Sequence, residues 1–373
     1  MEFKVDKGVL GEALALVSKA ISNTAPIPVQ INGVLINVRN DSVKLTGSDS
    51  DISIQKTLKV ADEKNRLEVI DEGDIVLDAR YLQEIVRKID SSIITIEVID
   101  GTFTKISGNK AEYKINGMRA IDYPNIDFNI DTDRYKLKVS IFEKIIKQTV
   151  FACSDKETRP ALMGVNFKAD GSVLTCNATN SFRLATKKVL LEDEMHFDIT
   201  IPAKTLNNVA SALVENLDFE MAIDETKVSF IFDDTIIRAR LIDDVYPDVS
   251  RLIPASFMQT LQVRCRDLLD AVERTSFIKS EGKNVVKLTI DNTKLDISSN
   301  SQEIGSSHEE LDIIEFIGSP ITISCSGRYL NDALRSIGSE IVILNFSGEL
   351  KPIVITEKDD DTLTQLISPI RGQ

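Results

Sequence analysis

Histidines and clustered carboxylates are the groups in this sequence that could transfer protons or bind a metal. Only two histidines occur, His196 and His308, and both stand among acidic residues. Acidic runs at 49–51 and 359–361 could offer oxygen ligands to Mg²⁺ or Ca²⁺. Neither run has the glycine at position 6 and the glutamate at position 12 of an EF-hand loop. We therefore interpret the histidines as solvated loop residues and the acidic runs as solvated turns.

The sequence also has no signature of thiol chemistry or of nucleotide binding. Cys153, Cys176, Cys265 and Cys325 lie far apart without a C-x-x-C pair, which favours core thiols over a zinc site or disulfides. No G-x-S-x-G, Walker loop or G-x-G-x-x-G occurs among the 17 glycines. The sequence thus predicts no catalytic residue, no metal site and no cofactor.

Basic side chains remain as candidates for a binding chemistry. Six amphipathic helices are expected, and they cover residues 7–20, 78–90, 140–150, 203–215, 265–276 and 327–338. These segments carry 12 Lys and Arg against 10 Asp and Glu, whereas the whole chain has a net charge of −14. The basic residues that lie away from the apolar stripes are Arg80, Arg87, Lys144, Lys147, Lys204, Arg266, Arg274, Arg328 and Arg335. Two interpretations stay open: solvated helix faces with i,i+4 partners, or a surface that contacts nucleic-acid phosphates without reading bases.

A threefold internal repeat positions these helices. Leu82, Leu206 and Leu330 stand at the same place in three similar helices, 124 residues apart. Each helix precedes β-rich runs, such as 93–99, which turns at Asp100-Gly101. The first two repeats also end with matching Tyr-Pro dipeptides at 123–124 and 246–247. A period of this length indicates a repeated supersecondary unit.

Each unit reads as helix, strands, helix, strands. A second helix opens each unit, and strand pairs follow it at 34–46, 165–175 and 286–298. The predicted fold class is α+β, with three tandem copies of one helix/antiparallel-sheet unit. The predicted domains are an N-terminal unit at 1–127, a central unit at 128–250 and a C-terminal unit at 251–373.

Tandem units of this kind would leave a free sheet edge at each end of the chain. Closure into a ring removes such edges, and contacts between the first unit of one chain and the third of another would be head-to-tail. The chain is 42 % apolar without a run of about 20 apolar residues. Residues 1–6 alternate like an edge strand and lack the apolar core of a secretory signal. We expect no membrane span and a cytoplasmic location.

The central unit carries three stretches with a family resemblance: Phe151-Ala152-Cys153-Ser154, Arg159-Pro160-Ala161-Leu162-Met163-Gly164-Val165 and Asn177-Ala178-Thr179-Asn180-Ser181-Phe182-Arg183-Leu184-Ala185. Together they resemble the bacterial sliding clamp, the beta subunit of DNA polymerase III. That family has a hallmark of the form A-T-D-x-x-R-L-A and ends in a short M-P-x-R-like tail. Here the tail is residues 366–373, and the resemblance covers the whole chain.

The resemblance implies a DNA clamp fold in which a head-to-tail homodimer forms a ring, with helices inside and sheets outside. Such a ring surrounds double-stranded DNA, has no catalytic site and is associated with the nucleoid. The implied partners are a clamp loader ATPase, together with DNA polymerase and repair proteins that bind through short linear peptides. Processivity would then come from enclosure and high local concentration.

Several site residues follow from the resemblance. The partner-peptide groove would comprise Leu162, Thr179, Ser181, Phe182, Arg183, Leu184, Pro247, Leu252, Leu366, Ser368, Pro369, Ile370 and Arg371. The dimer interface would set Tyr113 and Ile115 against Phe277 and Ile278. Lys156, Pro160 and Ala161 map onto a DNA-touching loop, and Lys156 joins the basic residues above as DNA-facing.

The sequence departs from the family pattern at three places near the groove. Asn180 replaces the usual aspartate, Ser368 replaces a common methionine, and Gly372-Gln373 replace a terminal leucine. Two other functions are alternatives to a clamp. One is a metal-dependent nuclease or phosphoesterase with scattered aspartate ligands, and the other is a repeat-built peptide-binding hub that never touches DNA.

Overall fold

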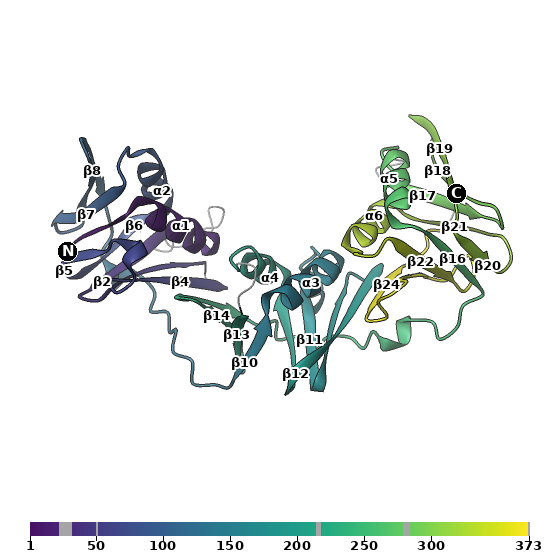
Figure 1. The fold of residues 1–373 in the computed structure, drawn as a ribbon, viewed down its shortest axis with the longest axis horizontal. Coiled ribbons are helices and arrows are strands. Elements are labelled where there is room, and N and C mark those ends of the chain that lie inside the picture. The colour runs from purple at the N-terminus through teal and green to yellow at the C-terminus, as the bar shows by residue number, and fades with distance from the viewer. Residues whose placement is uncertain (22–31, 50, 214–217, 279–283, 372–373) are drawn as a thin grey trace. The chain divides into compact units, whose positions relative to one another are not determined.

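The computed structural model describes residues 1–21, 32–49, 51–213, 218–278 and 284–371. Its α-helices are α1 (Lys7–Val17), α2 (Ala79–Lys88), α3 (Val139–Thr149), α4 (Ala203–Ala210), α5 (Cys265–Thr275) and α6 (Gly327–Ser336). Every sheet is antiparallel, and the element order repeats three times (Figure 1). The predicted α+β class with three tandem units is therefore confirmed.

Contacts divide the chain into two compact units, and the first consists of Met1–Ser140 with Asn208–Leu241. It holds two sheets. One has the order β5 (Glu68–Asp71), β1 (Glu2–Asp6), β7 (Ile93–Asp100), β8 (Phe103–Gly108), β9 (Ala111–Asn116). The other has the order β10 (Arg134–Lys138), β13 (Asp218–Ile223), β14 (Lys227–Phe232), β15 (Thr235–Arg240), β4 (Ile52–Lys59), β3 (Ser42–Ser48), β2 (Gly33–Arg39), β6 (Gly73–Asp78).

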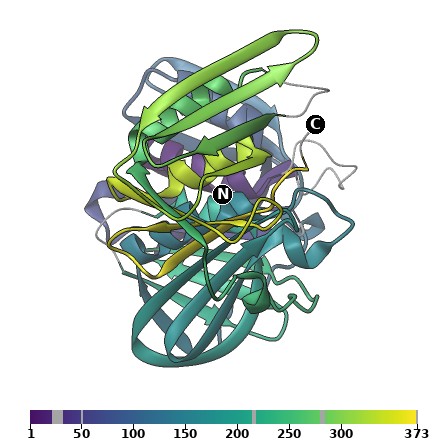
Figure 2. The same ribbon diagram turned by 90° about the vertical axis from the view of Figure 1, so that its right-hand side faces the viewer.

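The second unit consists of Ile141–Asn207 with Ile242–Gln373. Its larger sheet has the order β11 (Gly164–Thr179), β12 (Arg183–Pro202), β24 (Leu363–Ile367), β23 (Ile353–Glu357), β22 (Ile341–Phe346), β16 (Gln259–Arg264), β20 (Glu315–Ile317). Its smaller sheet has the order β19 (Gly305–Asp312), β18 (Lys294–Ser301), β17 (Val285–Ile290), β21 (Ile321–Ser326). Figure 2 shows this end of the chain from the side.

Local sequence explains where the helices begin and which face they bury. The Asp78 carboxylate accepts the Tyr81 backbone N–H at 3.0 Å and caps α2, and the Ser326 hydroxyl caps α6 in the same way. The three repeated leucines, Leu82, Leu206 and Leu330, are all fully buried. Helices pack in pairs, α1 with α2 and α5 with α6, over apolar sheet faces.

Several sequence predictions need correction. The fourth helix ends at Ala210 rather than 215, because the Ser211 hydroxyl donates to the Asn208 carbonyl and residues 211–212 form a turn, while 214 and 215 lie outside the described residues. Strand β1 lies between β5 and β7, so it is not an edge strand. Both histidines are exposed as predicted, yet they lie on strands β12 and β19 rather than in loops.

The two acidic runs are only partly solvated. Asp49 is buried, and its carboxylate accepts the backbone N–H groups of Asp51 and Ile52, which fixes a tight turn. Asp360 is half-buried in an ion-pair cluster, whereas its neighbours Asp359 and Asp361 are exposed. Sequence reasoning failed at Asp360 because its lysine partners come from distant parts of the chain, whereas Asp49 is fixed by backbone groups two and three residues away.

Each internal boundary between repeats is bridged by a sheet. Strand β15, the last of the second repeat, pairs with β4 of the first, with Thr235 opposite Lys56. Strand β24, the last of the third repeat, pairs with β12 of the second, with Leu363 opposite Lys187. The same connection is therefore made twice: the last strand of one repeat extends the sheet of the repeat before it.

Three charged side chains hold the second of these junctions. The Asp360 carboxylate lies 2.8 Å from Lys187 Nζ and 2.9 Å from Lys144 Nζ. Burial alone raises the pKa of Asp360, but hydrogen bonds from Lys187, Thr362 and Lys144 outweigh it, so the net pKa lies well below its usual range. Because the ionised form is favoured in the folded chain, Asp360 stabilises the fold at neutral pH.

In the part of the chain that the structure describes, no helix is both long and apolar enough to cross a membrane.

We expect Asp360→Asn to lower the free energy of unfolding by about 2 kcal/mol at pH 7, because it leaves the buried Lys187 amine without its counter-charge. The depressed pKa of Asp360 makes this contribution complete above about pH 4, and it fades as the pH falls further. Urea unfolding from pH 7 to pH 3 measures the difference from the unmodified chain. The exposed neighbour Asp361→Asn is the control, and equal losses in both variants would contradict the assignment.

Candidate functional site

A tight turn between β11 and β12 forms the centre of the predicted groove. The Asn180 side-chain oxygen accepts the N–H groups of Phe182 at 3.0 Å and Arg183 at 3.1 Å. The Thr179 hydroxyl donates to the Arg183 carbonyl at 2.6 Å, and Ser181 has a left-handed φ of 76°. This turn leaves the Phe182 side chain 59 % exposed. An asparagine serves here as well as an aspartate, because the turn needs only an acceptor oxygen.

Arg183 directs its guanidinium away from solvent. The side chain is only 7 % exposed, and Nη1 lies 2.6 Å from an Asp332 carboxylate oxygen on α6. The guanidinium also stacks over the ring of Tyr329 at 4.4 Å and lies 5.3 Å from the centre of Phe151. Arg183 therefore connects the second repeat to α6 of the third.

An apolar cluster lies beside this turn. Leu184 and Leu366 are buried and face each other across β12 and β24. Val249 and Val354 complete the cluster, and Tyr246 and Ile253 pack against it. These last four residues were not predicted. Signals for them existed, because Tyr246 and Val249 flank the predicted Pro247, and Ile253 follows the predicted Leu252.

The C-terminal tail runs alongside the same turn. The Ser368 N–H donates to the Phe182 carbonyl at 2.8 Å, and the Ile370 N–H donates to the Ser324 carbonyl at 2.8 Å. Ser368, Pro369 and Ile370 are half-buried and Arg371 is exposed, whereas Gly372 and Gln373 lie outside the described residues.

The remaining predicted groove residues differ in how exposed their side chains are. Leu162 is buried, while Pro247 and Leu252 are exposed. Arg159, which precedes the short helix η6 (Pro160–Met163), donates to the Ser181 hydroxyl at 2.9 Å and so brings Leu162 toward the turn. Backbone pairing and the apolar cluster thus bring most of the predicted residues together.

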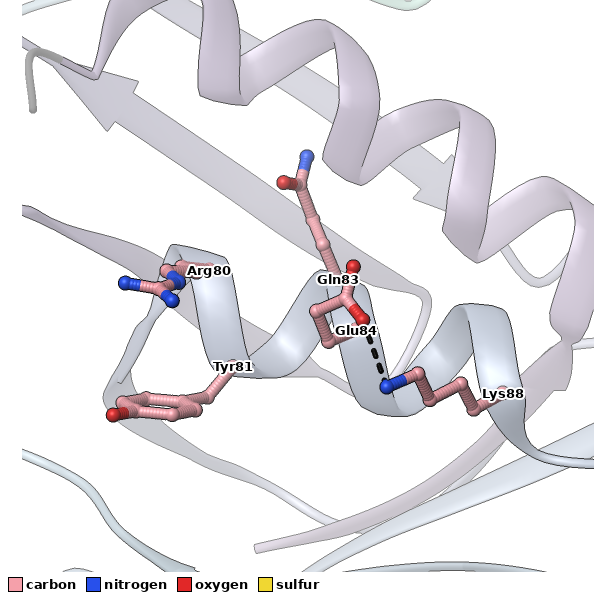
Figure 3. A pocket seen from close by; sticks show the side chains of 5 residues that line it. All are labelled: Arg80, Tyr81, Gln83, Glu84 and Lys88. Carbon is pink, nitrogen blue, oxygen red and sulfur yellow. Dashed lines mark ion pairs between the residues drawn. The ribbon is translucent and has the colours of Figure 1, made fainter.

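The predicted DNA-facing side chains are all exposed. Five of them form ion pairs with acidic neighbours: Arg87, Lys144, Arg266, Arg274 and Arg335. Figure 3 shows a further pair on α2, where Lys88, which was not among the predicted residues, lies 3.1 Å from Glu84 on the helix that also carries Arg80 and the exposed ring of Tyr81. Arg80, Lys147, Lys156 and Arg328 have no ion pair within the described residues, and Lys204 has a partner of its own. The helices thus offer a mixed rather than a strongly cationic surface.

The four predicted interface residues differ in exposure. Tyr113 on β9 and Phe277 after α5 are exposed, and Ile115 is half-buried. Ile278 is only 4 % exposed and therefore packs inside its own domain. At most three of the four side chains are free to meet a second chain.

The surroundings of the remaining reactive groups, the cysteines and the possible metal ligands, leave them unreactive. The cysteines are unbonded, and burial raises the pKa of Cys153 to about 12 and of Cys265 to about 11. The core-thiol prediction is confirmed for Cys176, Cys265 and Cys325, which are buried, whereas Cys153 is half-buried. Across the described ranges, no three His, Cys, Asp or Glu side chains gather in a way that could hold a metal ion.

We expect Arg183→Met to lower the free energy of unfolding by about 3 kcal/mol, because it removes a buried charge that pairs with Asp332 and stacks on Tyr329. Chemical denaturation of Arg183→Met, Asp332→Asn and the double variant forms a double-mutant cycle. A coupling near zero between the two positions would argue against the inter-repeat tie. Arg240→Met, which removes an exposed arginine outside this contact, is the matched control.

Three family profiles match in tandem: the N-terminal domain of the DNA polymerase III beta subunit over residues 1–127, the central domain over 136–248 and the C-terminal domain over 250–371. The beta sliding clamp of Bacillus subtilis (strain 168) is 36 % identical over 377 residues, with both chains covered in full. That of Staphylococcus epidermidis RP62A is 35 % identical, with 100 % of this chain and 99 % of the relative covered.

Solved structures agree with the sequence relatives. The crystal structure of the DNA polymerase sliding clamp from Bacillus subtilis superimposes with a TM-score of 0.96 at 36 % identity. The DNA polymerase III beta chain from Streptococcus pneumoniae TIGR4 gives 0.95 at 29 % identity, and both comparisons cover each chain in full. The chain belongs to the family of DNA polymerase III beta subunits, the beta sliding clamps.

Proposed function

We propose that two copies of this chain join head to tail into a ring that encloses duplex DNA and holds replication and repair proteins on it. The ring is an accessory subunit without a catalytic site, and it acts on the nucleoid in the cytoplasm. A loader ATPase opens it, and polymerases bind it through short peptides. The unpaired strands at the two ends of the repeat array carry this proposal.

The two ends of the array present complementary edges. Strand β9 ends its sheet, and it is the last strand of the first repeat, as β15 and β24 are of the others. Strand β19 is an edge strand of the smaller sheet of the third repeat. It corresponds to β4 of the first repeat and to β12 of the second. Both internal junctions join a last strand to such an outer strand, so β9 of one copy fits β19 of another. Pairing at both ends closes a dimer and leaves neither edge open.

The helix surfaces suit weak contact with phosphates. Half of the candidate basic residues are already paired with carboxylates, which lowers their attraction for DNA. A clamp that slides needs this weakness, because strong or base-specific contacts would stop its movement. Enclosure then supplies the retention that affinity does not.

The turn at 179–183 and the tail support a peptide site. The exposed Phe182 and Leu252 stand near a buried apolar cluster, and an extended peptide anchored by leucine or phenylalanine suits such a surface. The backbone in this region is firmly hydrogen-bonded, so the site is largely formed before a peptide arrives.

We expect the loaded protein to stay on a nicked circular plasmid and to leave after the plasmid is cut once, because enclosure fails when DNA has ends. Gel filtration of labelled protein with the plasmid, before and after cutting, measures retention. The test uses the full chain and a cognate loader with ATP. Equal retention on circular and linear DNA would contradict enclosure, and no retention on either form would favour a hub that never touches DNA.

Deletion of residues 369–373 should remove partner binding and leave the dimer intact, because the tail contacts the turn at 179–183 and lies far along the sheet from β19. Fluorescence anisotropy with a polymerase tail peptide measures the loss, which we expect to exceed tenfold for truncation of a pocket-lining segment, on the order of 1.4 kcal/mol or more. Sedimentation velocity checks the dimer. Unchanged peptide affinity would refute the groove assignment.

A further inference from the structure

Two ion pairs form at the junction between the first two repeats, at the turn that leads into strand β15. The β14–β15 turn is Asp233-Asp234, and its carboxylates lie 2.7 Å from Lys56 Nζ and 2.5 Å from Lys59 Nζ on β4. The Thr57 N–H also donates to the Asp234 carbonyl at 2.8 Å. We call this arrangement the turn latch: an acidic turn on the last strand, held by lysines on the outer strand.

The junction between the second and third repeats has a turn latch of the same polarity. Asp360, in the β23–β24 turn, pairs with Lys187 on β12, and Lys187 holds the place of Lys56. The Lys188 N–H donates to the Thr362 carbonyl at 2.8 Å, as Thr57 does to the turn of the second repeat. Both internal junctions therefore set acidic turns against basic strands.

The corresponding turn of the first repeat has the opposite charge. The β8–β9 turn is Asn109-Lys110, and Gly108 pairs with Ala111 around it as Phe232 pairs with Thr235. Asn109 and Asp233 share a left-handed φ of 48°, so the two turns have the same shape. Lys110 therefore stands at the position of Asp234.

The corresponding outer strand is also reversed. On β4, Lys56 lies opposite the buried Leu45 of β3; on β19, Glu309 lies opposite the buried Ile297 of β18. Three residues further along each strand stand Lys59 and Asp312. Asp312 therefore holds the place of Lys59, and the basic strand has become an acidic one.

We propose that Lys110 of one copy forms an ion pair with Asp312 of a second copy, which is the turn latch with its polarity inverted. This inference rests on the proposed ring. In the register of the internal junctions, Ala111 lies opposite Glu309, and the Glu310 N–H donates to the Lys110 carbonyl. Both Lys110 and Asp312 are exposed, and neither has an ion pair among the described residues of its own chain.

The inversion gives the edges selectivity. A Lys110 turn set against β4 would meet Lys56 and Lys59, and against β12 it would meet Lys187, so like charges oppose both pairings. Only β19 offers acidic residues at these places. During folding and assembly, β9 is thereby directed to a second copy rather than to the outer strands of its own chain.

The test is a charge swap followed by sedimentation velocity over a dilution series. We expect Lys110→Glu and Asp312→Lys to raise the dimer dissociation constant about tenfold each, since each replaces an exposed attraction by a repulsion at two joints. The double swap should return the constant to within about threefold of the unmodified value. Both single effects should shrink in about 0.5 M NaCl because salt screens exposed charges.

The control is Lys44→Glu, which makes the same charge change at an exposed site on β3 and should leave the dimer unchanged. Circular dichroism checks that each variant is folded. If the unmodified chain dimerises and the single swaps match it, or the double swap fails to recover, the latch is wrong and the ring stands. If the unmodified chain remains a monomer and does not stay on circular DNA, the ring itself is wrong.

Discussion

The pairing of β-strand edges joins the repeats of this chain, and the rest of the structure depends on it. A row of unpaired backbone N–H and C=O groups invites pairing with another strand. The chain makes such a pairing twice internally, where β15 extends the sheet of β4 and β24 extends that of β12. The array still leaves β9 at one end and β19 at the other. The proposed ring would pair these two edges between copies of the chain.

The internal junctions show how differently one connection can be stabilised. Lys187 is almost completely buried beside Asp360, and Arg183 is buried between two rings and Asp332. Lys59, in the first junction, is half-exposed beside Asp234. Buried pairs penalise separation strongly because each leaves an unpaired charge, whereas exposed pairs contribute little and respond to salt. The two internal junctions thus use ion pairs of both kinds.

Arg183 also connects two surfaces of the second unit. Its backbone belongs to the turn that exposes Phe182, and its guanidinium contacts Tyr329 and Asp332 on α6, the helix that carries Arg328 and Arg335. The turn of the candidate peptide groove and a helix with candidate DNA contacts thus share one side chain. The acidic excess of the chain lies largely outside the helices.

The sequence alone determined the threefold repeat, the helices with their buried stripes, the hairpins and the absence of catalytic motifs, because these depend on local periodicity and on words such as the evenly spaced Leu82, Leu206 and Leu330. Only the tertiary structure decided that Asp49 and Asp360 are not solvated, that Ile278 and the Arg183 side chain face inward, and that Val249 and Val354 join the groove cluster. The physical reason is range: the ion pairs Arg183–Asp332 and Lys187–Asp360 join residues 149 and 173 positions apart, and burial depends on how whole elements pack, which no local pattern encodes.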